Sequence, residues 1–358
     1  IKDNAGYEIE KKITFSIDKT APVIKMLYKG GNADAIYNNI YKDARTAVIE
    51  IKERNFRASD VKLVINSSSG IKPTVSDWVE TKNGDNPKET TYTAQIVFAN
   101  DGEYNIEVSF EDMAGNKAAD IKGDSFIIDK TLPEITVTFN NNVPKNGMYY
   151  SENRVAMITI KEQNFDAGRI NIEGMSLADG VASHAFVTGT WNNIGDVHRI
   201  LVECNEDGIY KFGISGKDKA GNLLETHISD SFVVDKTMPE IIVTGVQDKS
   251  ANNKAIYPVV EIRDKNFNQN GNVIELKGAN QGTVECNGQY TTTAQGKIFE
   301  FAGFEDSKTV DDLYTLRVIH TDMAGNTMNK IVNFMVNIIN DNDSDDDSDD
   351  DDDDDDDD

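Results

Sequence analysis

The segment Asp207-Gly208-Ile209-Tyr210-Lys211-Phe212 decides the fold class, because it opens a pattern that the chain repeats. It is followed by Asp218-Lys219-Ala220-Gly221-Asn222 and then by Asp235-Lys236-Thr237-Met238-Pro239. Gly, Asp, Asn and Pro form turns, and the residues between these motifs are rich in apolar side chains. The run therefore predicts two β-strands separated by a tight turn and ended by a short, stiff linker.

The linker, the turn and a third motif, Ile-Lys/Arg-Glu/Asp-x-Asn-Phe, each occur three times in the same order. The linkers begin at Asp18, Asp129 and Asp235, the third motif at Ile51, Ile160 and Ile262, and the turns at Asp112, Asp218 and Asp322. A period of about 110 residues is too long for a solenoid repeat and suits a domain with its own core. The chain is therefore expected to be a string of whole domains.

Strand signals fill each repeat, and no segment keeps the 3.6-residue period of a helix. In the second repeat, Glu134 to Phe139 alternates polar and apolar residues, and Val155 to Ile160 is also strand-like. Short strands separated by turn signals are typical of an all-β sandwich.

Asp101-Gly102-Glu103-Tyr104 and Asp207-Gly208-Ile209-Tyr210 resemble the tyrosine corner of immunoglobulin-like domains. The third copy, Asp311-Asp312-Leu313-Tyr314, lacks the Gly. With the turn and linker motifs, the pattern over residues 1–337 is similar to the immunoglobulin-like repeats of large bacterial cell-surface and secreted proteins. The resemblance implies an extracellular, all-β chain of three tandem immunoglobulin-like β-sandwiches in an elongated array.

The linker motifs define the expected domain organisation. Residues 1–17 read as the last strand of a preceding module, which we expect to be frayed or abnormally paired because a lone strand has no sheet to join. The other expected parts are module 1 at 18–129, module 2 at 130–235, module 3 at 236–339 and a disordered poly-Asp tail at 340–358.

Composition argues against several classes of partner. The net charge is −26, and the C-terminal Asp run supplies much of it, so nucleic acid and anionic lipid are disfavoured. No stretch approaches the roughly 18 to 20 apolar residues of a membrane span, so no membrane insertion is expected. We expect a monomer within a longer chain.

The cysteines and tryptophans do not recur in all three repeats. Cys204 and Cys286 lack counterparts, which favours two buried thiols over a repeated disulfide framework. Trp78 and Trp191 occur in the first two repeats only. They could stack on a sugar, but a packing role is favoured.

Signs of catalysis are absent from the sequence. The histidines show no metal-ligand spacing, and no nucleophile motif or phosphate-binding loop is present. The histidines are His184, His198, His227 and His320. The chain is therefore not expected to be an enzyme or to hold a cofactor, calcium excepted.

The calcium hypothesis follows from topology. In an immunoglobulin-like sandwich the B–C loop, the F–G turn and the incoming linker share one end, so each repeat should gather three carboxylates there. They are Asp18, Glu53 and Asp112; Asp129, Glu162 and Asp218; and Asp235, Asp264 and Asp322, each trio with two Asn neighbours (Asn55 and Asn116; Asn164 and Asn222; Asn266 and Asn326). Three carboxylates repel one another unless neutralised, and Ca²⁺ prefers such oxygens.

Cadherins stiffen their domain junctions with calcium, which is an analogy only. In the alternative interpretation the motifs only form hydrogen-bonded turns, and Lys19, Lys130 and Lys236 supply the counter-charge. The Phe that closes each third motif, at positions 56, 165 and 267, is expected to plug the end of the sandwich.

Two functions remain. The first is a non-catalytic stalk of a bacterial surface protein, which three modules would extend over about 110 Å. The second is an adhesin-type module that recognises a host protein or glycan, because the middle segments differ among repeats while the motifs do not.

Overall fold

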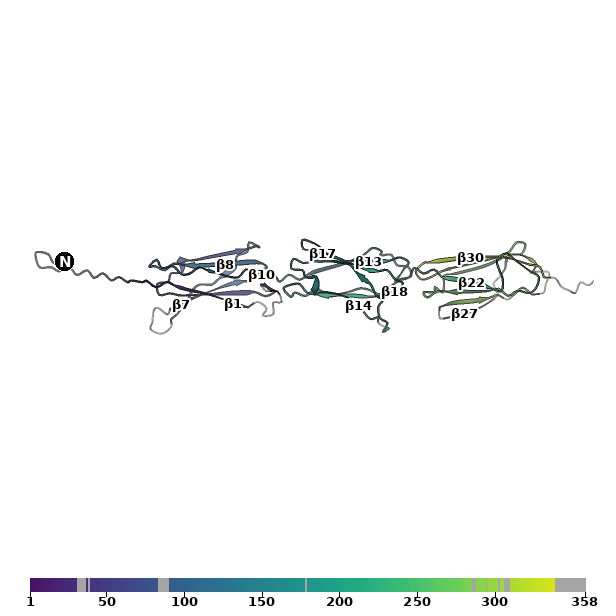
Figure 1. The fold of residues 1–358 in the computed structure, drawn as a ribbon, viewed down its shortest axis with the longest axis horizontal. Helices are drawn as coiled ribbons and strands as arrows, with labels where there is room; N and C mark the ends of the chain where they lie inside the picture. Colours follow the sequence, from purple (N-terminus) through teal and green to yellow (C-terminus); the bar gives the residue numbers. More distant parts are fainter. Residues whose placement is uncertain are drawn as a thin grey trace, which may run out of the picture.

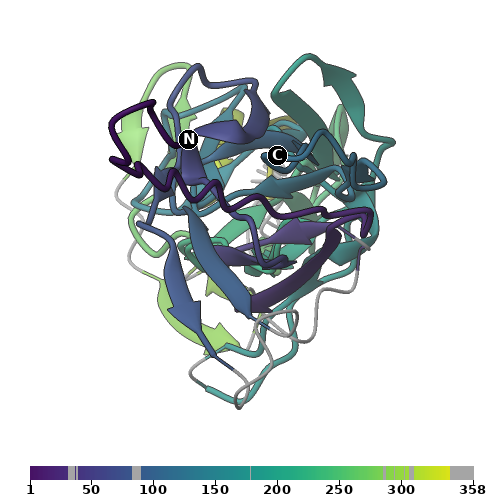
Figure 2. The same cartoon turned by 90° about the vertical axis from the view of Figure 1, so that its left-hand side faces the viewer.

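The computed structural model describes residues 1–30, 37, 39–82, 90–177, 179–284, 288–293, 295–301, 303–305 and 310–338. It contains three β-sandwiches, here called modules 1, 2 and 3, which follow one another in a line (Figure 1). Viewed along this line, the modules project onto one another (Figure 2). The predicted all-β fold of three tandem sandwiches is confirmed. The predicted poly-Asp tail and Cys286 lie outside the described residues.

Module 1 consists of two sheets. In one, the strands follow the order β1-β3-β7-β5, with β6 also paired to β7; in the other the order is β2-β10-β8-β4, with β9 paired to β8. This is the immunoglobulin arrangement of an ABED sheet facing a CFG sheet. The elements are β1 (Val23–Gly30), β2 (Ile40–Tyr41), β3 (Arg45–Lys52), η1 (Ala58–Asp60), β4 (Val61–Ser67), β5 (Thr74–Val75), β6 (Val79–Thr81), β7 (Thr91–Phe98), β8 (Gly102–Phe110), β9 (Ile121–Lys122) and β10 (Phe126–Ile128).

Module 2 repeats this arrangement with β11-β13-β17-β15 as one sheet and β16 on β17. Its second layer is divided into β12-β21-β18 and β14-β19-β20, because both long strands are interrupted. The elements are β11 (Glu134–Phe139), β12 (Tyr149–Tyr150), β13 (Arg154–Lys161), η3 (Ala167–Arg169), β14 (Ile170–Gly174), β15 (Val187–Thr188), β16 (Asn192–Ile194), β17 (Val197–Cys204), β18 (Gly208–Tyr210), β19 (Phe212–Gly216), β20 (His227–Ile228) and β21 (Phe232–Val234).

Module 3 has uninterrupted F and G strands, β29 and β30, which pair along their whole length. Its sheets follow the orders β22-β24-β28-β27 and β23-β30-β29-β25-β26. The elements are β22 (Glu240–Thr244), β23 (Ser250–Asn252), β24 (Val259–Arg263), β25 (Asn272–Gly278), β26 (Gly282–Val284), β27 (Gln289–Thr293), β28 (Gly296–Glu300), β29 (Asp312–Thr321) and β30 (Thr327–Val336).

Each module has its own apolar core between its two sheets. The tyrosine corner is present in all three: the hydroxyls of Tyr104, Tyr210 and Tyr314 donate to backbone carbonyls four residues upstream at 2.7–2.8 Å. The third corner forms without the Gly of the other two: Asp312, which stands at that position, is the first residue of β29 and does not have the positive φ of Gly102. The modules therefore fold around the same anchor at the start of the F strand.

The N-terminal segment, residues 1–17, joins no sheet, as expected. Asp3 forms a turn like those of the modules, with its Oδ1 accepting from the amide N–H groups of Ala5 and Tyr7 at 2.9 Å. Ile13 and Phe15 are 75% and 79% exposed, so the apolar alternation here is left without a sheet to cover it. None of the helical segments in the described part of the chain has the length and apolar character of a membrane span.

Candidate metal centres in the three modules

Three carboxylates converge at the end of each module where the linker arrives. In module 2, Asp129 lies in the linker, Glu162 follows β13, and Asp218 starts the turn after β19; one ligand atom from each lies within 4.8 Å of the other two. We name these residues cluster 2. Cluster 1 is Asp18, Glu53 and Asp112, and cluster 3 is Asp235, Asp264 and Asp322.

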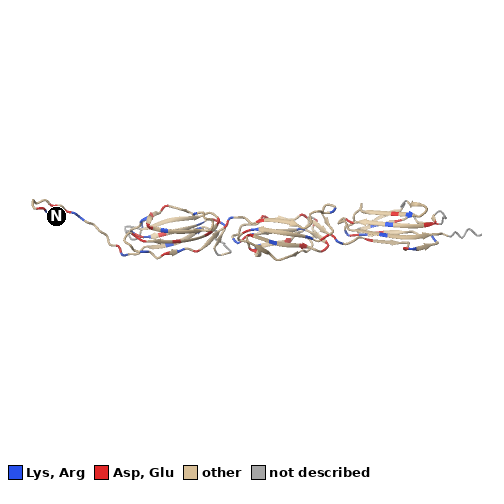
Figure 3. Ribbon diagram, turned by 90° about the horizontal axis from the view of Figure 1, so that it is seen from above, with Lys and Arg blue, Asp and Glu red and all other residues tan. Residues whose placement is uncertain are grey.

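The predicted convergence is thus present in all three modules. Whether the clusters hold a metal stays a prediction. Figure 3 shows Asp and Glu at the ends of the modules where they meet.

The turn motif fixes the third carboxylate of each cluster. Asp218 Oδ1 accepts from the amides of Gly221 (2.7 Å) and Asn222 (2.9 Å), and Oδ2 accepts from Asn222 Nδ2 (2.8 Å). Gly221 has φ +96°, which favours glycine, so the motif has the structural role that its composition predicts. The same turn also holds the Asp218 carboxylate against the linker.

The linker Asp is bonded to both of its neighbouring modules. The Asp129 amide donates to Tyr41 O of module 1 (2.8 Å). Asn164 Nδ2 donates to Asp129 Oδ2 (2.7 Å), and Asn222 Nδ2 donates to Asp129 O (2.9 Å), both from module 2. Asp129 is therefore the residue through which cluster 2 contacts the preceding module.

The junction of modules 2 and 3 repeats this arrangement. The Asp235 amide donates to Tyr150 O (2.9 Å), while Asn266 and Asn326 donate from module 3 to its carboxylate and carbonyl oxygens, each at 2.9 Å. The two Asn positions predicted beside each trio are thus hydrogen-bond donors to the linker Asp.

The carboxylates of clusters 2 and 3 are buried, and in cluster 2 the Arg169 guanidinium bonds the backbone carbonyl of Asp218 (2.6 Å) rather than a carboxylate. Asp129, Glu162 and Asp218 are 5%, 4% and 1% exposed. Burial, together with the charges of Asp129 and Asp218, raises the pKa of Glu162 to about 7 against the opposing hydrogen bond from Asn164. Burial likewise raises the pKa of Asp264 to about 6. Burial is the main cause of both rises, because it disfavours the charged form of a carboxyl group.

The alternative interpretation is correct about the hydrogen-bonded turns, but its lysine counter-charge is contradicted at clusters 2 and 3. Lys130 Nζ donates to Ala99 O (2.6 Å), and Lys236 Nζ donates to Asn205 O (2.6 Å) and Asn153 Oδ1 (3.0 Å). Both ammonium groups therefore bond to the preceding module. Among the described residues, no Lys or Arg forms an ion pair with a carboxylate of these two clusters.

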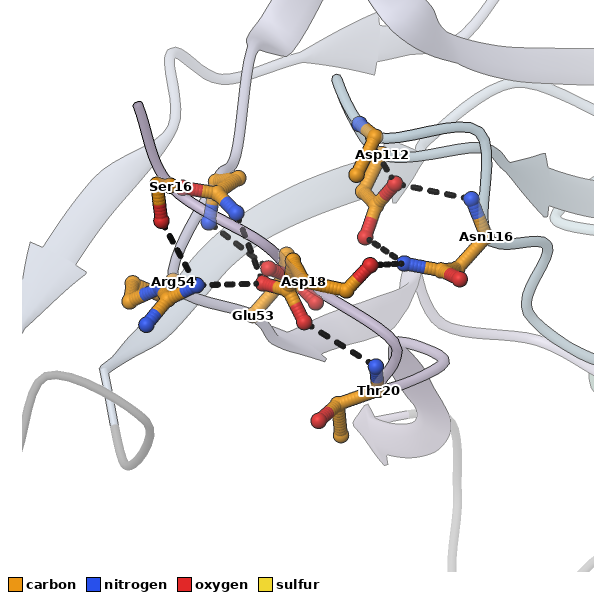
Figure 4. Close-up of polar contacts among 9 residues, drawn as sticks. Ser16, Asp18, Thr20, Glu53, Arg54, Asp112 and Asn116 are labelled. Atoms are coloured by element: carbon orange, nitrogen blue, oxygen red, sulfur yellow. Dashed lines mark hydrogen bonds and ion pairs between the residues drawn. The ribbon is translucent and has the colours of Figure 1, made fainter. Parts of the chain in front are cut away.

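Cluster 1 differs, because an arginine lies against it (Figure 4). Arg54 Nη2 is 2.9 Å from Asp18 Oδ2 and 3.5 Å from Ser16 Oγ. The alternative interpretation of the sequence offered Lys19 as the counter-charge, and the sequence analysis did not consider Arg54. A single sequence does not show where a long side chain that follows a strand will point, so it does not single out Arg54.

A second set of hydrogen bonds ties the linkers that begin at Asp129 and Asp235 to the module before them. Thr131 Oγ1 and the Lys130 amide donate to the two oxygens of Asp101, at 2.7 and 3.0 Å. Thr237 Oγ1 and the Lys236 amide bond Asp207 in the same way, at 2.5 and 3.0 Å. The sequence analysis placed these Asp residues in the tyrosine corner and missed their bonds to the linker. A usable signal was that an Asp recurs 30 residues before the Thr of both linkers.

Loops of the preceding modules make a third contact at each junction. Tyr37 of module 1 donates its hydroxyl to Asp166 Oδ2 of module 2, and its ring lies 5.6 Å from the Arg169 guanidinium carbon. Asn146 Nδ2 of module 2 donates to Met323 O of module 3 at 2.8 Å. The residues that form this third contact differ between the two junctions, whereas the linker bonds are the same at both.

The aromatic residues at this end pack rather than present a surface. Phe56 lies 5.1 Å from Trp78, and Phe165 lies 4.8 Å from Trp191, measured between ring centroids. All four pack against the module cores, as does Phe267, which favours the packing role and the predicted end plugs. Cys204 is fully buried, and burial raises the pKa of its thiol to about 12, so it is an inert core residue.

The donor set of clusters 2 and 3 fits a hard divalent cation. Each offers three carboxylates within reach of one another and no nitrogen or sulfur ligand among the described residues. Ca²⁺ takes six to eight such oxygens in flexible geometry, whereas Mg²⁺ requires a near-ideal octahedron.

Comparison with known sequences identifies the repeats. The family described as bacterial Ig-like domain (group 3) matches residues 88–227 and again 201–340. The chain belongs to this family. No curated protein matches it significantly in sequence.

Among solved structures, the ICAM-5 D1-D4 ectodomain fragment is 8% identical, with 89% of this chain and 78% of that chain covered and a TM-score of 0.39. Protocadherin gamma B2 extracellular cadherin domains 1-5 are 13% identical over 78% of this chain, with a TM-score of 0.30. The chain spans about half the length of that protocadherin fragment, 53%.

Proposed function

We propose that this chain is a non-catalytic stalk segment of a bacterial cell-surface protein, and that Ca²⁺ bound at the carboxylate clusters stiffens its junctions. The observation that carries the proposal is the placement of Asp129 and Asp235, each bonded to both neighbouring modules and each part of a buried carboxylate trio. Tandem bacterial Ig-like domains are typically extracellular and non-catalytic, which supports this role.

Ca²⁺ is the proposed cation because each cluster buries several negatively charged oxygen ligands. Clusters 2 and 3 bury three carboxylates each without a Lys or Arg ion pair among the described residues. Asp129, Glu162 and Asp218 would hold one ion, and Asp235, Asp264 and Asp322 another. Because the linker Asp is a member of each trio, loading the site would fix the linker to two loops of the following module.

A measurement of shape tests the proposal directly. Small-angle scattering of the chain should show an elongated particle both in chelator and in Ca²⁺. Interdomain distances from fluorophores placed in modules 1 and 3 should become more narrowly distributed with Ca²⁺ and respond much less to Mg²⁺. A compact particle would refute the stalk, and an unchanged distance distribution would refute the stiffening.

A binding role is the second candidate, and one surface favours it. On the outer face of β29 and β30, Leu313 (50% exposed) pairs with Met335 (44%), and Ile331 is 49% exposed on the same face. The equivalent face of β8 in module 1 carries Glu103, Asn105 and Glu107. This apolar stripe, which the Thr315–Asn333 pair interrupts, fits a host protein better than a glycan.

That candidate has its own test. Leu313→Ser should abolish capture of an immobilised host extracellular protein if the stripe is the contact. Glu107→Ser on the matching face of module 1 is the control. Capture that is equal for both variants would remove module 3 from consideration as the binding surface.

A further inference from the structure

The three clusters are not equivalent, and they differ at the position whose side chain can contact the linker carboxylate. Between the second carboxylate and the Asn of each third motif lie Arg54, Gln163 and Lys265. These side chains follow β3, β13 and β24 at the end where the linker arrives. The position therefore carries a cation in module 1, a neutral amide in module 2 and a different cation in module 3.

In module 1 the cation is in direct contact with a cluster carboxylate. Asp18 Oδ2 accepts from Arg54 Nη2 at 2.9 Å and from Asn55 Nδ2 at 2.7 Å, while Asp18 Oδ1 accepts from the Thr20 amide at 3.0 Å (Figure 4). The Asp18 side chain is 8% exposed and that of Arg54 is 28% exposed, so the pair is largely shielded from water. The linker carboxylate of cluster 1 is thus neutralised by the protein itself.

In module 2 the donors to the matching carboxylate, among the residues that the structure describes, are amide groups. Asp129 Oδ2 accepts from Asn164 Nδ2 at 2.7 Å and Oδ1 from the Thr131 amide at 3.2 Å. Gln163 carries no charge. In module 3, Lys265 lines the cleft that holds Asp235 and Asp264, but among the described residues it forms no ion pair with them. The ammonium of Lys265 is therefore not fixed on the cluster as the Arg54 guanidinium is.

We infer that Arg54 is a built-in counter-ion that takes the place of a metal at cluster 1, so that the linker of module 1 is held independently of Ca²⁺ while the two junctions depend on it. The inference rests on the proposed calcium function of clusters 2 and 3. An arginine stays protonated at any physiological pH, so this difference persists across conditions. Cluster 1 would then anchor its linker at all times, and Ca²⁺ would control only the flexibility between modules.

The size of the effect follows from Coulomb's law. A divalent ion bound to the far side of Asp18 would lie roughly 5 Å from the guanidinium, and even at the dielectric constant of water the repulsion corresponds to a loss of on the order of tenfold in affinity. Partial burial makes the loss larger. The neutral Gln163 imposes no such penalty on cluster 2.

Reciprocal substitutions test the inference in the full chain. The probe is CaCl₂, and the readout is the side-chain amide resonances of Asn55 and Asn116 for cluster 1 and of Asn164 and Asn222 for cluster 2, followed by nuclear magnetic resonance. Because the readout is residue-specific, Ca²⁺ bound by the Asp-rich C-terminal stretch does not enter it. MgCl₂ serves as the ionic-strength control.

In the unaltered chain, cluster 1 should respond at a Ca²⁺ concentration at least about tenfold higher than cluster 2, or not at all. Arg54→Gln should bring the two midpoints together, and Gln163→Arg should weaken cluster 2 to the level of cluster 1. Arg57→Gln is the matched control, because Arg57 lies in the same loop, pairs with Asp60 at 2.8 Å and touches no cluster residue. It should leave both midpoints nearly unchanged.

The outcomes separate the two ideas. Equal midpoints in the unaltered chain, or an Arg54→Gln chain whose cluster 1 responds no better, overturn the inference while the calcium function stands. A cluster 2 that never responds to Ca²⁺ refutes the calcium function and the inference with it. If Arg54→Gln does not fold, the Gln163→Arg arm decides alone, since a cluster 2 unaffected by the added guanidinium overturns the inference.

Discussion

Asp218→Asn should separate the two roles of the turn motif, because it removes a charge and keeps an acceptor. Asp218 Oδ1 accepts from the amides of Gly221 and Asn222, and an Asn carbonyl oxygen can accept both bonds. The bond from Asn222 Nδ2 to Oδ2 is lost, because an amide nitrogen would face another donor. The cluster also changes from three carboxylates to two.

The magnitudes differ with and without calcium. In chelator, the lost hydrogen bond costs about 1 kcal/mol, and the relief of repulsion on Glu162, whose pKa is raised to about 7, offsets part of it. The net change should stay within about 1 kcal/mol. With Ca²⁺ at a hundredfold excess over Kd, the unaltered module gains about 2.7 kcal/mol, and the variant loses most of this gain.

The assay is urea unfolding of the full chain in a Trp78→Phe background, where Trp191 is the remaining tryptophan and reports module 2. Asp230→Asn, an exposed site in the same module, controls for net charge. The expected result is a calcium-dependent gap between Asp218→Asn and the parent that nearly closes in chelator. An equal gap in both conditions would show that Asp218 only forms a turn, and would refute the reasoning.

Three further outcomes are expected. In chelator, the free energy of unfolding of module 2 should fall as pH rises from about 5 to 8, because the folded-state pKa of Glu162 (about 7) exceeds its unfolded value of 4.5 and the protonated form favours folding. Urea midpoints should show a loss of at most about 3 kcal/mol, and Glu162→Gln should remove most of this pH dependence. Thr237→Val removes the bond to Asp207 and should broaden distances between labels on modules 2 and 3 without lowering either unfolding midpoint. Tyr210→Phe should destabilise module 2 by about 1 kcal/mol or more in urea, since it deletes both hydrogen bonds between the hydroxyl and the Glu206 backbone; no change would mean that water replaces the hydroxyl.

The strands and the tyrosine corners were predictable because they are local. Alternation in Glu134–Phe139 gives β11 with the predicted bounds, and Ile158 and Ile160 of β13 are fully buried, as their spacing requires. The carboxylate clusters were predictable for a different reason. Once the sandwich topology is given, the ends of strands B and F must lie at one end of the module, which places Glu162 beside Asp218.

What sequence could not give is the direction of long, flexible side chains. Lys130 and Lys236 lie one residue from a carboxylate cluster, yet their ammonium groups reach carbonyls of the preceding module. Arg54, which has no special spacing, reaches Asp18 across the linker instead. Such choices depend on which acceptors the folded loops leave open. The interrupted second layer of module 2 likewise involves a side-chain contact that no local pattern announces, because the Phe212 amide donates to the Ser229 hydroxyl oxygen at 3.0 Å.

The linker owes its stiffness to a division of its polar groups between two modules. Asp235 directs its carboxylate and carbonyl oxygens forward to module 3, while Lys236 and Thr237 bond backward to Asp207 of module 2. Because the two sets of bonds belong to consecutive residues, rotation about the linker must break at least one of them. A cation at cluster 3 would strengthen only the forward set. Chelation should therefore release module 3 from the linker while the linker stays fixed to module 2, so that the array bends at the N-terminal end of each following module.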